Sequence, residues 1–159
     1  MNHNSTFKQR STIPDIADEK FQEYAVKNDN ILYCKRYGFD ERTSGMNIST
    51  WMAIPKELRA SPDFFIISKD RIPCFVEVKG CTNILRLKLD DLDVYNEWNG
   101  KIIKDIKLYF YIYSVAYNTG ISISLNNLLD NCFNLKHTMG RYEDNGKEYY
   151  KIKFMDLII

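Results

Sequence analysis

The stretch SPDFFIISKDRIPCFVEVKG, residues 61–80, contains two short apolar runs separated by a polar break. Residues 64–67 and 74–78 are rich in β-branched and aromatic side chains, which favour strands. The break between them combines Ser, Lys, Asp, Arg and a Pro, a composition typical of a turn. The sequence therefore predicts a hairpin of two strands here, with charged residues standing at the strand ends.

Three of these charged residues predict a chemical site. Glu77 and Lys79 are two apart on one strand, so they share a face, and a charged pair on so apolar a strand is costly in a dry core without partners. The hairpin turn is short enough to bring Asp63 near Glu77, and two converging carboxylates repel unless a cation neutralises them. Carboxylate oxygens suit Mg²⁺ or Mn²⁺, and an adjacent ammonium can orient a water or stabilise charge on a phosphate oxygen.

The same residues have a plainer interpretation. Glu77 and Lys79 could be an exposed pair on an edge strand, although the apolar residues around them favour a central strand. Asp63, taken alone, could simply begin a strand after Pro62. Only the whole set favours a functional site.

The rest of the chain predicts the elements that surround the hairpin. A helix is expected over residues 16–27, a strand over 31–37, a helix over 85–98, a strand over 106–115, a short helix over 125–133 and a last strand over 149–155. This order predicts the α/β class, with a central mixed sheet flanked by helices. We expect residues 1–14 to form a flexible N-terminal tail and residues 15–159 to form a single domain.

Pro62-Asp63 followed, after the hairpin turn, by Glu77-Val78-Lys79 resembles the motif of the PD-(D/E)xK nuclease superfamily. The resemblance implies a restriction-endonuclease-like core, in the order αβββαβ, over residues 16–115. It also implies that Asp63, Glu77 and the carbonyl of Val78 bind Mg²⁺, with Mn²⁺ as a substitute, and that Lys79 is the catalytic lysine.

The resemblance extends to the flanking helices. The superfamily often carries a further acidic residue on the preceding helix, which implies Glu19, with Glu23 as the rival position. It often carries a Lys or Gln on the following helix, a part that Lys88 or Arg86 could play. The spacing from Glu19 to the next strand is similar to that in phage junction-resolving endonucleases, and the motif spacing is similar to that in archaeal-type Holliday junction resolvases.

The expected activity is that of a Mg²⁺-dependent DNA endonuclease, selective for DNA structure or resolving junctions. A net charge of only +1 means that any DNA contact depends on local positive charge, for which Lys35, Arg36 and Arg86 are candidates. Two symmetric cuts call for two sites, so a homodimer is expected. The alternatives are a catalytically silent DNA-binding or assembly module with this fold, and an endonuclease that cleaves RNA.

The motifs that would indicate other classes of enzyme or metal site are missing from the sequence. The four cysteines form no C-x-x-C pair, no Gly-rich phosphate loop is present, and neither His lies in a recognisable catalytic context. The chain shows no signal peptide and no apolar run of about 18 residues, so a cytoplasmic protein is expected, without a membrane partner or a small-molecule cofactor. Its small size is typical of a phage or mobile-element protein.

Overall fold

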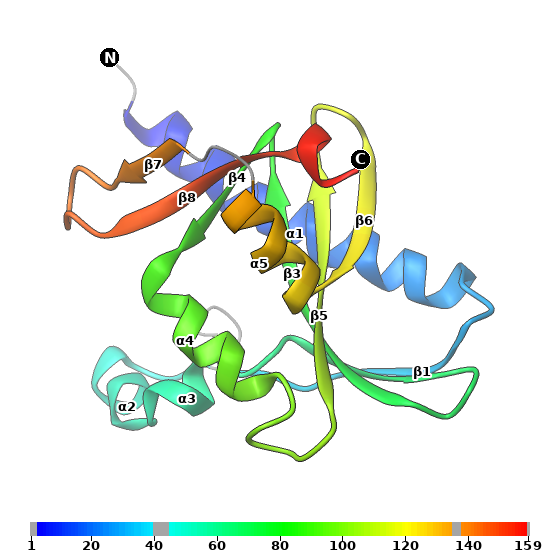
Figure 1. Ribbon diagram of the computed structural model, residues 1–159. Coiled ribbons are helices and arrows are strands. Elements are labelled where there is room, and N and C mark those ends of the chain that lie inside the picture. Colours follow the sequence, from blue (N-terminus) through cyan, green and yellow to red (C-terminus); the bar gives the residue numbers. More distant parts are fainter. Residues whose placement is uncertain (1–2, 40–44, 135–137, 159) are drawn as a thin grey trace.

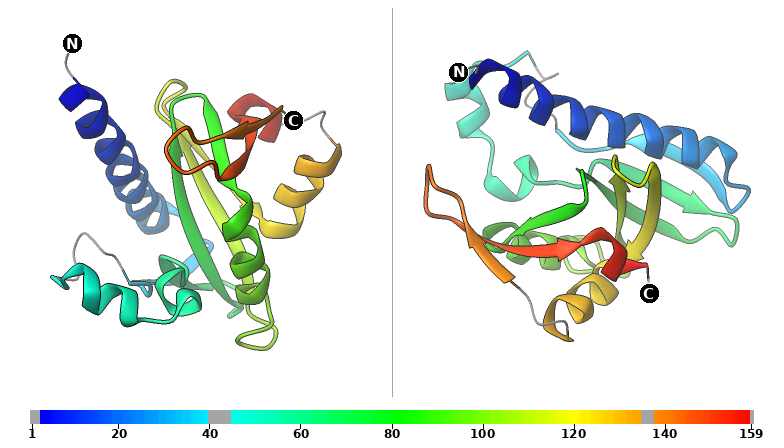
Figure 2. Two further views of the ribbon diagram at one scale, coloured as in Figure 1. Left: turned by 90° about the vertical axis from the view of Figure 1, so that its left-hand side faces the viewer. Right: turned by 90° about the horizontal axis from the view of Figure 1, so that it is seen from above.

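A computed structural model places a central β-sheet between two layers, and describes residues 3–39, 45–134 and 138–158. One long helix covers one face of this sheet, and two shorter helices together with a second, smaller sheet cover the other (Figures 1 and 2). The expected α/β class, with a central mixed sheet flanked by helices, is confirmed.

The helices and strands follow one another in an order that contains the predicted core. The helices are α1 (His3–Lys27), α2 (Ile48–Ala53), α3 (Lys56–Arg59), α4 (Leu89–Trp98), α5 (Leu125–Asn134) and the 3₁₀ helix η1 (Phe154–Leu157). The strands are β1 (Ile31–Arg36), β2 (Phe64–Ser68), β3 (Pro73–Cys81), β4 (Ile84–Lys88), β5 (Lys107–Ser114), β6 (Thr119–Ser124), β7 (Thr138–Arg141) and β8 (Glu148–Lys153). The predicted order αβββαβ is present as α1, β1, β2, β3, α4 and β5.

The central sheet has the strand order β1-β2-β3-β5-β6. Strands β1, β2 and β3 pair antiparallel, β3 and β5 pair parallel, and β6 returns antiparallel along β5. The predicted hairpin is therefore β2 and β3, and β3 is central rather than an edge strand. This removes the interpretation of Glu77 and Lys79 as an edge-strand pair.

The second sheet, in the order β4-β8-β7, differs from the prediction of one helix over residues 85–98. The first part of that segment is strand β4, and α4 begins only at Leu89. Leu85 and Leu87 alternate with exposed residues, and each is buried against the main core. Alternation over five residues is the strand period, whereas the leucines at 85, 89 and 92 also match a helical period. Pairing with β8, far away in sequence, decides between the two.

Helix α1 also differs from the prediction. It begins at His3, whereas residues 1–14 were expected to form a flexible tail and the helix to begin near residue 16; residues 1 and 2 lie outside the described part of the chain. The tertiary reason lies at Gly80, where a Cβ atom would come within 2.7 Å of the Ile13 carbonyl oxygen and 3.1 Å of the Ala17 side chain. The helix therefore crosses β3 in close contact at Ile13 and Ala17, which holds the turns on either side of Pro14 against the sheet.

We expect Gly80→Ala to destabilise the protein by about 1–3 kcal/mol, because the added methyl group meets helix backbone rather than a flexible side chain. The measurement is the free energy of unfolding in urea, with Thr82→Ala as a control on the exposed segment just beyond β3. Equal stability of the two variants would contradict the close crossing of α1 over β3.

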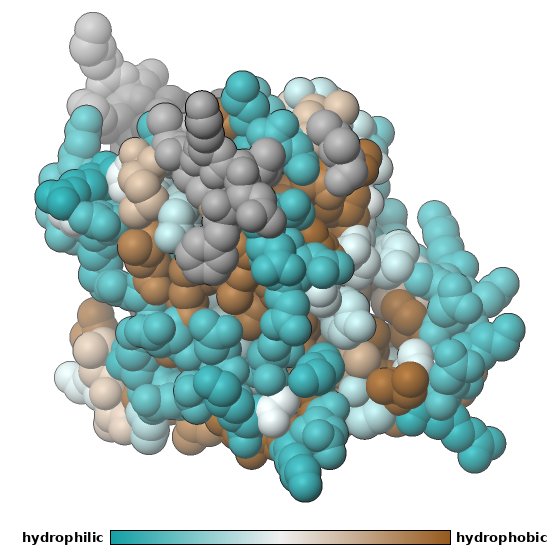
Figure 3. Space-filling view, in the orientation of Figure 1, coloured by the Kyte–Doolittle hydropathy of each residue, from teal (hydrophilic) through white to brown (hydrophobic). Residues whose placement is uncertain are grey.

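Two hydrophobic clusters hold the layers together. The smaller one joins Ala17, Phe21 and Ala25 of α1 to one face of the sheet, and the larger one joins α4, α5, β4 and β8 to the opposite face. Hydrophilic residues cover much of the surface over α4, and hydrophobic residues show mainly toward the middle of that view (Figure 3). None of the described helices has the length and apolar character needed to span a membrane.

Candidate active site

The site begins with the register of the β2–β3 hairpin. Phe64, the first residue of β2, pairs with Val76. Because the strands are antiparallel, the residue before it, Asp63, lies opposite Glu77. Strand β2 begins only at Phe64, and the Asp63 side chain supplies a partner to β3 just before it: its Oδ2 accepts a hydrogen bond of 2.8 Å from the backbone N–H of Val78. The backbone of Asp63 is held as well, because its carbonyl oxygen accepts from the N–H of Tyr37 at 2.8 Å. The predicted approach of Asp63 to Glu77 is thus present.

Glu77 and Lys79 project from β3 toward α4. The Lys79 Nζ lies 2.8 Å from the Glu77 Oε1, and the hydroxyl of Tyr95 donates to the same oxygen at 3.1 Å. About 30% of the Lys79 side chain is exposed, against 10% of Glu77, so Lys79 is the more exposed member of this pair. Lys79 also lies over the Tyr95 ring, 5.4 Å from its centroid.

Tyr95 is a residue of the site that the sequence analysis does not name. The structure buries it on α4, packs its ring edge-on against Phe110 at 5.1 Å and directs its hydroxyl to Glu77. Buried tyrosines usually find a partner for the hydroxyl. A Tyr among the leucines of a helix face indicates only weakly that a buried hydroxyl needs a hydrogen-bond partner. Which residue accepts that hydrogen bond is decided when α4 docks on β3.

The charges of the site shift one another's ionisation. Burial, and then the neighbouring Glu77 carboxylate, raise the pKa of Asp63 to about 7, against smaller opposing effects of Lys79 and the Val78 N–H. Burial lowers the pKa of Lys79, but the Glu77 carboxylate outweighs this and holds it well above the usual range. Near neutral pH, Lys79 is therefore an ammonium and Asp63 is poised between its two forms.

Helix α1 brings a third carboxylate to this region, although not the expected one. Asp18 accepts a hydrogen bond of 2.5 Å from Arg36, and its charge contributes to the raised pKa of Asp63. Glu19 is exposed, and Glu23 is exposed and pairs with Lys20 at 3.3 Å. At about 100° per residue, Asp18 falls beside the Ala17–Phe21 stripe that packs on the sheet, whereas Glu19 falls nearly opposite that stripe. A helical wheel of α1 would have favoured Asp18 over Glu19 as the carboxylate facing the sheet, and the sequence analysis missed this.

The other predicted residues lie in two separate places. Lys35 is exposed on β1, and Arg36 next to it lies over the Phe64 ring at 4.6 Å while pairing with Asp18. Arg86 and Lys88 lie on β4 of the second sheet, not on the helix after the motif, for the reason given for that segment above. The predicted DNA-contacting residues therefore do not form one cluster.

The donor set resembles that of a site for a hard divalent cation. Mg²⁺ keeps several waters and is commonly held by one or two carboxylates, which Asp63 and Glu77 supply. The N–H and C=O of one strand residue face the same neighbour, so the Val78 carbonyl faces the Asp63 side of β3 as its N–H does. The described part of the chain contains no group of three or more His, Cys, Asp or Glu side chains placed to hold a metal, so water would complete the coordination.

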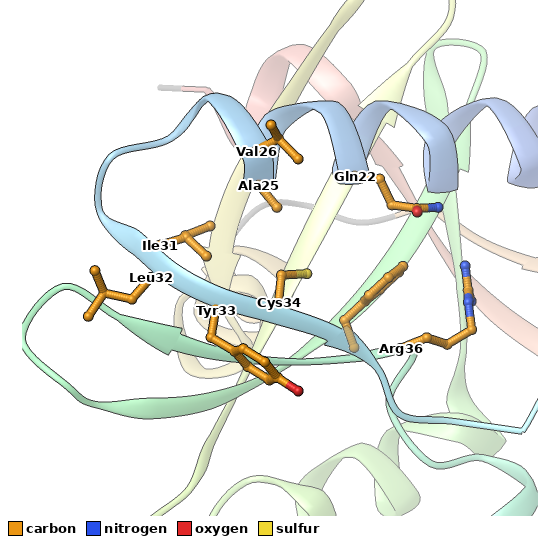
Figure 4. Close-up of a pocket in the computed structure, with 9 residues that line it drawn as sticks. Gln22, Ala25, Val26, Ile31, Leu32, Tyr33, Cys34 and Arg36 are labelled. Atoms are coloured by element: carbon orange, nitrogen blue, oxygen red, sulfur yellow. The ribbon is translucent and has the colours of Figure 1, made fainter.

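A separate hollow of about 380 Å³ lies between the end of α1 and β1 (Figure 4). Most of the residues that line it are apolar, with Val26, Leu32 and Tyr33 exposed, and its cation, Arg36, is engaged by Asp18. Burial raises the pKa of the Cys34 thiol, which keeps it protonated and unreactive. The hollow lacks the paired acid and base groups of the β2–β3 site.

We expect Tyr95→Phe to destabilise the protein by roughly 1.5–3 kcal/mol, the usual contribution of a hydrogen bond to a charged group. Thermal and urea unfolding measure the loss. Tyr109→Phe is the matched control, because Tyr109 is partly exposed and its hydroxyl has no hydrogen bond within residues 3–39, 45–134 and 138–158. Equal effects of the two changes would contradict the bond between Tyr95 and Glu77.

Comparison with known proteins yields one structural similarity. No protein-family model matches the chain, and no curated protein matches its sequence. The chain is similar to the solved structure of Hjc, a Holliday junction resolvase from the archaeal hyperthermophile Archaeoglobus fulgidus, with 13% sequence identity over 91% of this chain and 89% of that chain, and a TM-score of 0.47. The chemistry of the site is therefore judged from its own residues.

Proposed function

We propose that the protein is a metal-dependent DNA endonuclease that hydrolyses phosphodiester bonds at the Asp63–Glu77–Lys79 site. The observation that carries the proposal is the convergence of two carboxylates and one ammonium at the point where β2 begins beside β3. A structural ion pair would need only Glu77 and Lys79. The additional half-buried Asp63 has a pKa raised to about 7 by burial and by Glu77, and a strongly shifted carboxyl beside an ion pair is typical of a functional site.

Asp63, Glu77 and the Val78 carbonyl would hold Mg²⁺, with Mn²⁺ as a substitute. The cation would supply Lewis acidity at the scissile phosphate and lower the pKa of a bound water. The Lys79 ammonium has three donors and gives one of them to Glu77, so the others can reach a water or a phosphate oxygen. Lys79 would thus orient the attacking water and stabilise the charge that develops on the phosphate.

Asp18 is the carboxylate of α1 that we assign to this site in place of Glu19. We expect Asp18→Asn to lower cleavage about tenfold, because it releases Arg36 and removes a charge that acts on Asp63. Glu19→Gln, one residue further along the helix and exposed, is the matched control and should cleave like the unchanged protein. The reverse result, with Glu19→Gln impaired and Asp18→Asn active, would restore the prediction made from sequence.

The test of the proposed function is cleavage by the purified full chain. Supercoiled plasmid, linear duplex, single strand, four-way junction and RNA are incubated with Mg²⁺, with Mn²⁺ and with EDTA. We expect metal-dependent cutting of DNA, with the four-way junction cut in two symmetric places by a homodimer, whose mass is measured by light scattering. Cutting of RNA alone would overturn the DNA assignment. Absence of cutting with both metals by a folded protein would leave a binding or assembly module.

A further inference from the structure

The outer face of the second sheet carries four cations. On β4 the inward residues Leu85 and Leu87 are buried in the core, which directs Arg86 and Lys88 outward. On β8 the inward residue Ile152 is buried, and Lys151 and Lys153 project from the opposite face. The face therefore presents Arg86, Lys88, Lys151 and Lys153 together.

The register of this sheet sets like charges against each other. Arg86 pairs directly with Lys151 across β4 and β8, and Lys88 and Lys153 lie two residues away along the same face. Like charges placed opposite each other on neighbouring strands destabilise a sheet. Within residues 3–39, 45–134 and 138–158 none of the four forms a salt bridge, so no carboxylate of these residues pairs with the positive charge of the face.

A groove of about 530 Å³ lies between this face and helix α1. One wall is Ile13 and Pro14 of α1, the floor is the end of β3 from Gly80, and the other wall includes Arg86, Tyr142 and Lys151. The view from above in Figure 2 shows α1 on one side and β7 and β8 on the other. Gly80 directly follows Lys79 along β3, and the Lys79 charge also acts on the pKa of Tyr142, which lines the groove.

Aromatic rings lie among the cations of this face. Tyr142 packs on Tyr149 with ring centroids 4.4 Å apart. Arg86 lies 5.2 Å from the Tyr149 ring centroid and Lys88 lies 5.7 Å from that of Tyr142. Tyr149 is buried, so the half-buried Tyr142 is the ring that a base could contact in the groove. A positive groove with an aromatic ring in its wall is an arrangement by which proteins bind single-stranded nucleic acid, since phosphates contact the cations and a base stacks on the ring.

We propose that the outer face of the β4–β8–β7 sheet and its groove bind one unpaired strand of nucleic acid and lead it to Lys79. The proposal rests on the proposed function in one respect, namely that the bound strand is the substrate of the site. The charge of the face selects a polyanion, and a groove of this volume accommodates a ligand of one or two nucleotides. The substrate is therefore a DNA that exposes a single strand at the point of cutting.

The test is binding of a fluorescent single-stranded oligonucleotide in EDTA, where cleavage cannot interfere. We expect Arg86→Gln combined with Lys151→Gln to weaken binding roughly tenfold at moderate salt, and to reduce the slope of log K against log salt by about 1.4, the value for two phosphate contacts on a single strand. The charge-matched control is Arg71→Gln with Lys104→Gln, two exposed cations on the β2–β3 turn and on the loop after α4, which should leave both quantities nearly unchanged.

The inference would be overturned if the two double variants lost oligonucleotide binding equally, or if neither lost it. It would also be overturned if only the binding of blunt duplex were weakened, or if the unchanged protein did not bind the oligonucleotide. Weakened binding by the Arg86 and Lys151 variant of a protein that cuts nothing would support the inference and overturn the proposed function. In a third outcome, the variant cuts a substrate with a single-stranded arm, at low concentration, as well as the unchanged protein does. That result would support the proposed function and overturn the inference.

Discussion

Lys79→Ala should reduce cleavage roughly 100- to 1,000-fold, the usual effect of removing one preorganised donor from a site where charge develops. The reason is the position of the ammonium, which lies beside two carboxylates on a partly exposed side chain and is held by Glu77 at 2.8 Å. The neutral methyl group of alanine cannot orient a water or stabilise the charge on a phosphate oxygen. Single-turnover cleavage with Mg²⁺, at protein in excess over DNA, measures the loss without interference from product release.

Loss of fold is the competing explanation for such a result, and two further variants exclude it. Lys79→Gln keeps a donor for Glu77 without the charge, so it should fold and bind DNA normally and still cleave at least 100-fold more slowly. Lys69→Ala removes an exposed lysine from the β2–β3 turn and should cleave normally. Cleavage by Lys79→Gln at the rate of the unchanged protein would assign Lys79 a structural role and sink the proposed mechanism.

Asp63→Asn should change how stability depends on pH. Asp63 has its pKa raised to about 7 by burial and by Glu77, against about 3.9 in the unfolded chain. Between these values the folded state binds a proton that the unfolded state has released, so the contribution of Asp63 is fully present at low pH and is lost as pH rises. The loss is about 1.4 kcal/mol per pH unit and roughly 4 kcal/mol in total. Asn cannot titrate, so the variant should be more stable than the unchanged protein at pH 8 and lack this slope.

Urea unfolding from pH 4 to pH 8 measures the difference, with Asp70→Asn on the exposed β2–β3 turn as the control. Parallel stability curves for Asp63→Asn and the unchanged protein would contradict the raised pKa.

The same variants test binding of the cation by a readout other than activity. At pH 8, Mg²⁺ should raise the melting temperature of the unchanged protein and of Asp70→Asn, and should leave that of Asp63→Asn unchanged, because a cation that binds only the folded state stabilises it.

The hairpin and its three charged residues could be predicted because the information is local. Residues 64–67 and 74–78 have strand composition, the break between them is short, and the antiparallel pairing then places Asp63 opposite Glu77. The alternation of a strand likewise placed Glu77 and Lys79 on one face, since successive side chains point to opposite sides. Element order followed from these same short-range patterns.

What the sequence alone determined, then, is the β2–β3 hairpin, the αβββαβ order and the approach of Asp63, Glu77 and Lys79. Tertiary structure decided which other residues meet them: docking of α4 brings the Tyr95 hydroxyl to Glu77, and the packed face of α1 brings Asp18 rather than Glu19. It also decided that residues 84–88 are a strand, because their partner β8 begins 60 residues later. The physical reason is common to all of these cases: the side-chain period of a short segment is ambiguous, and burial against a distant partner selects one face and one conformation.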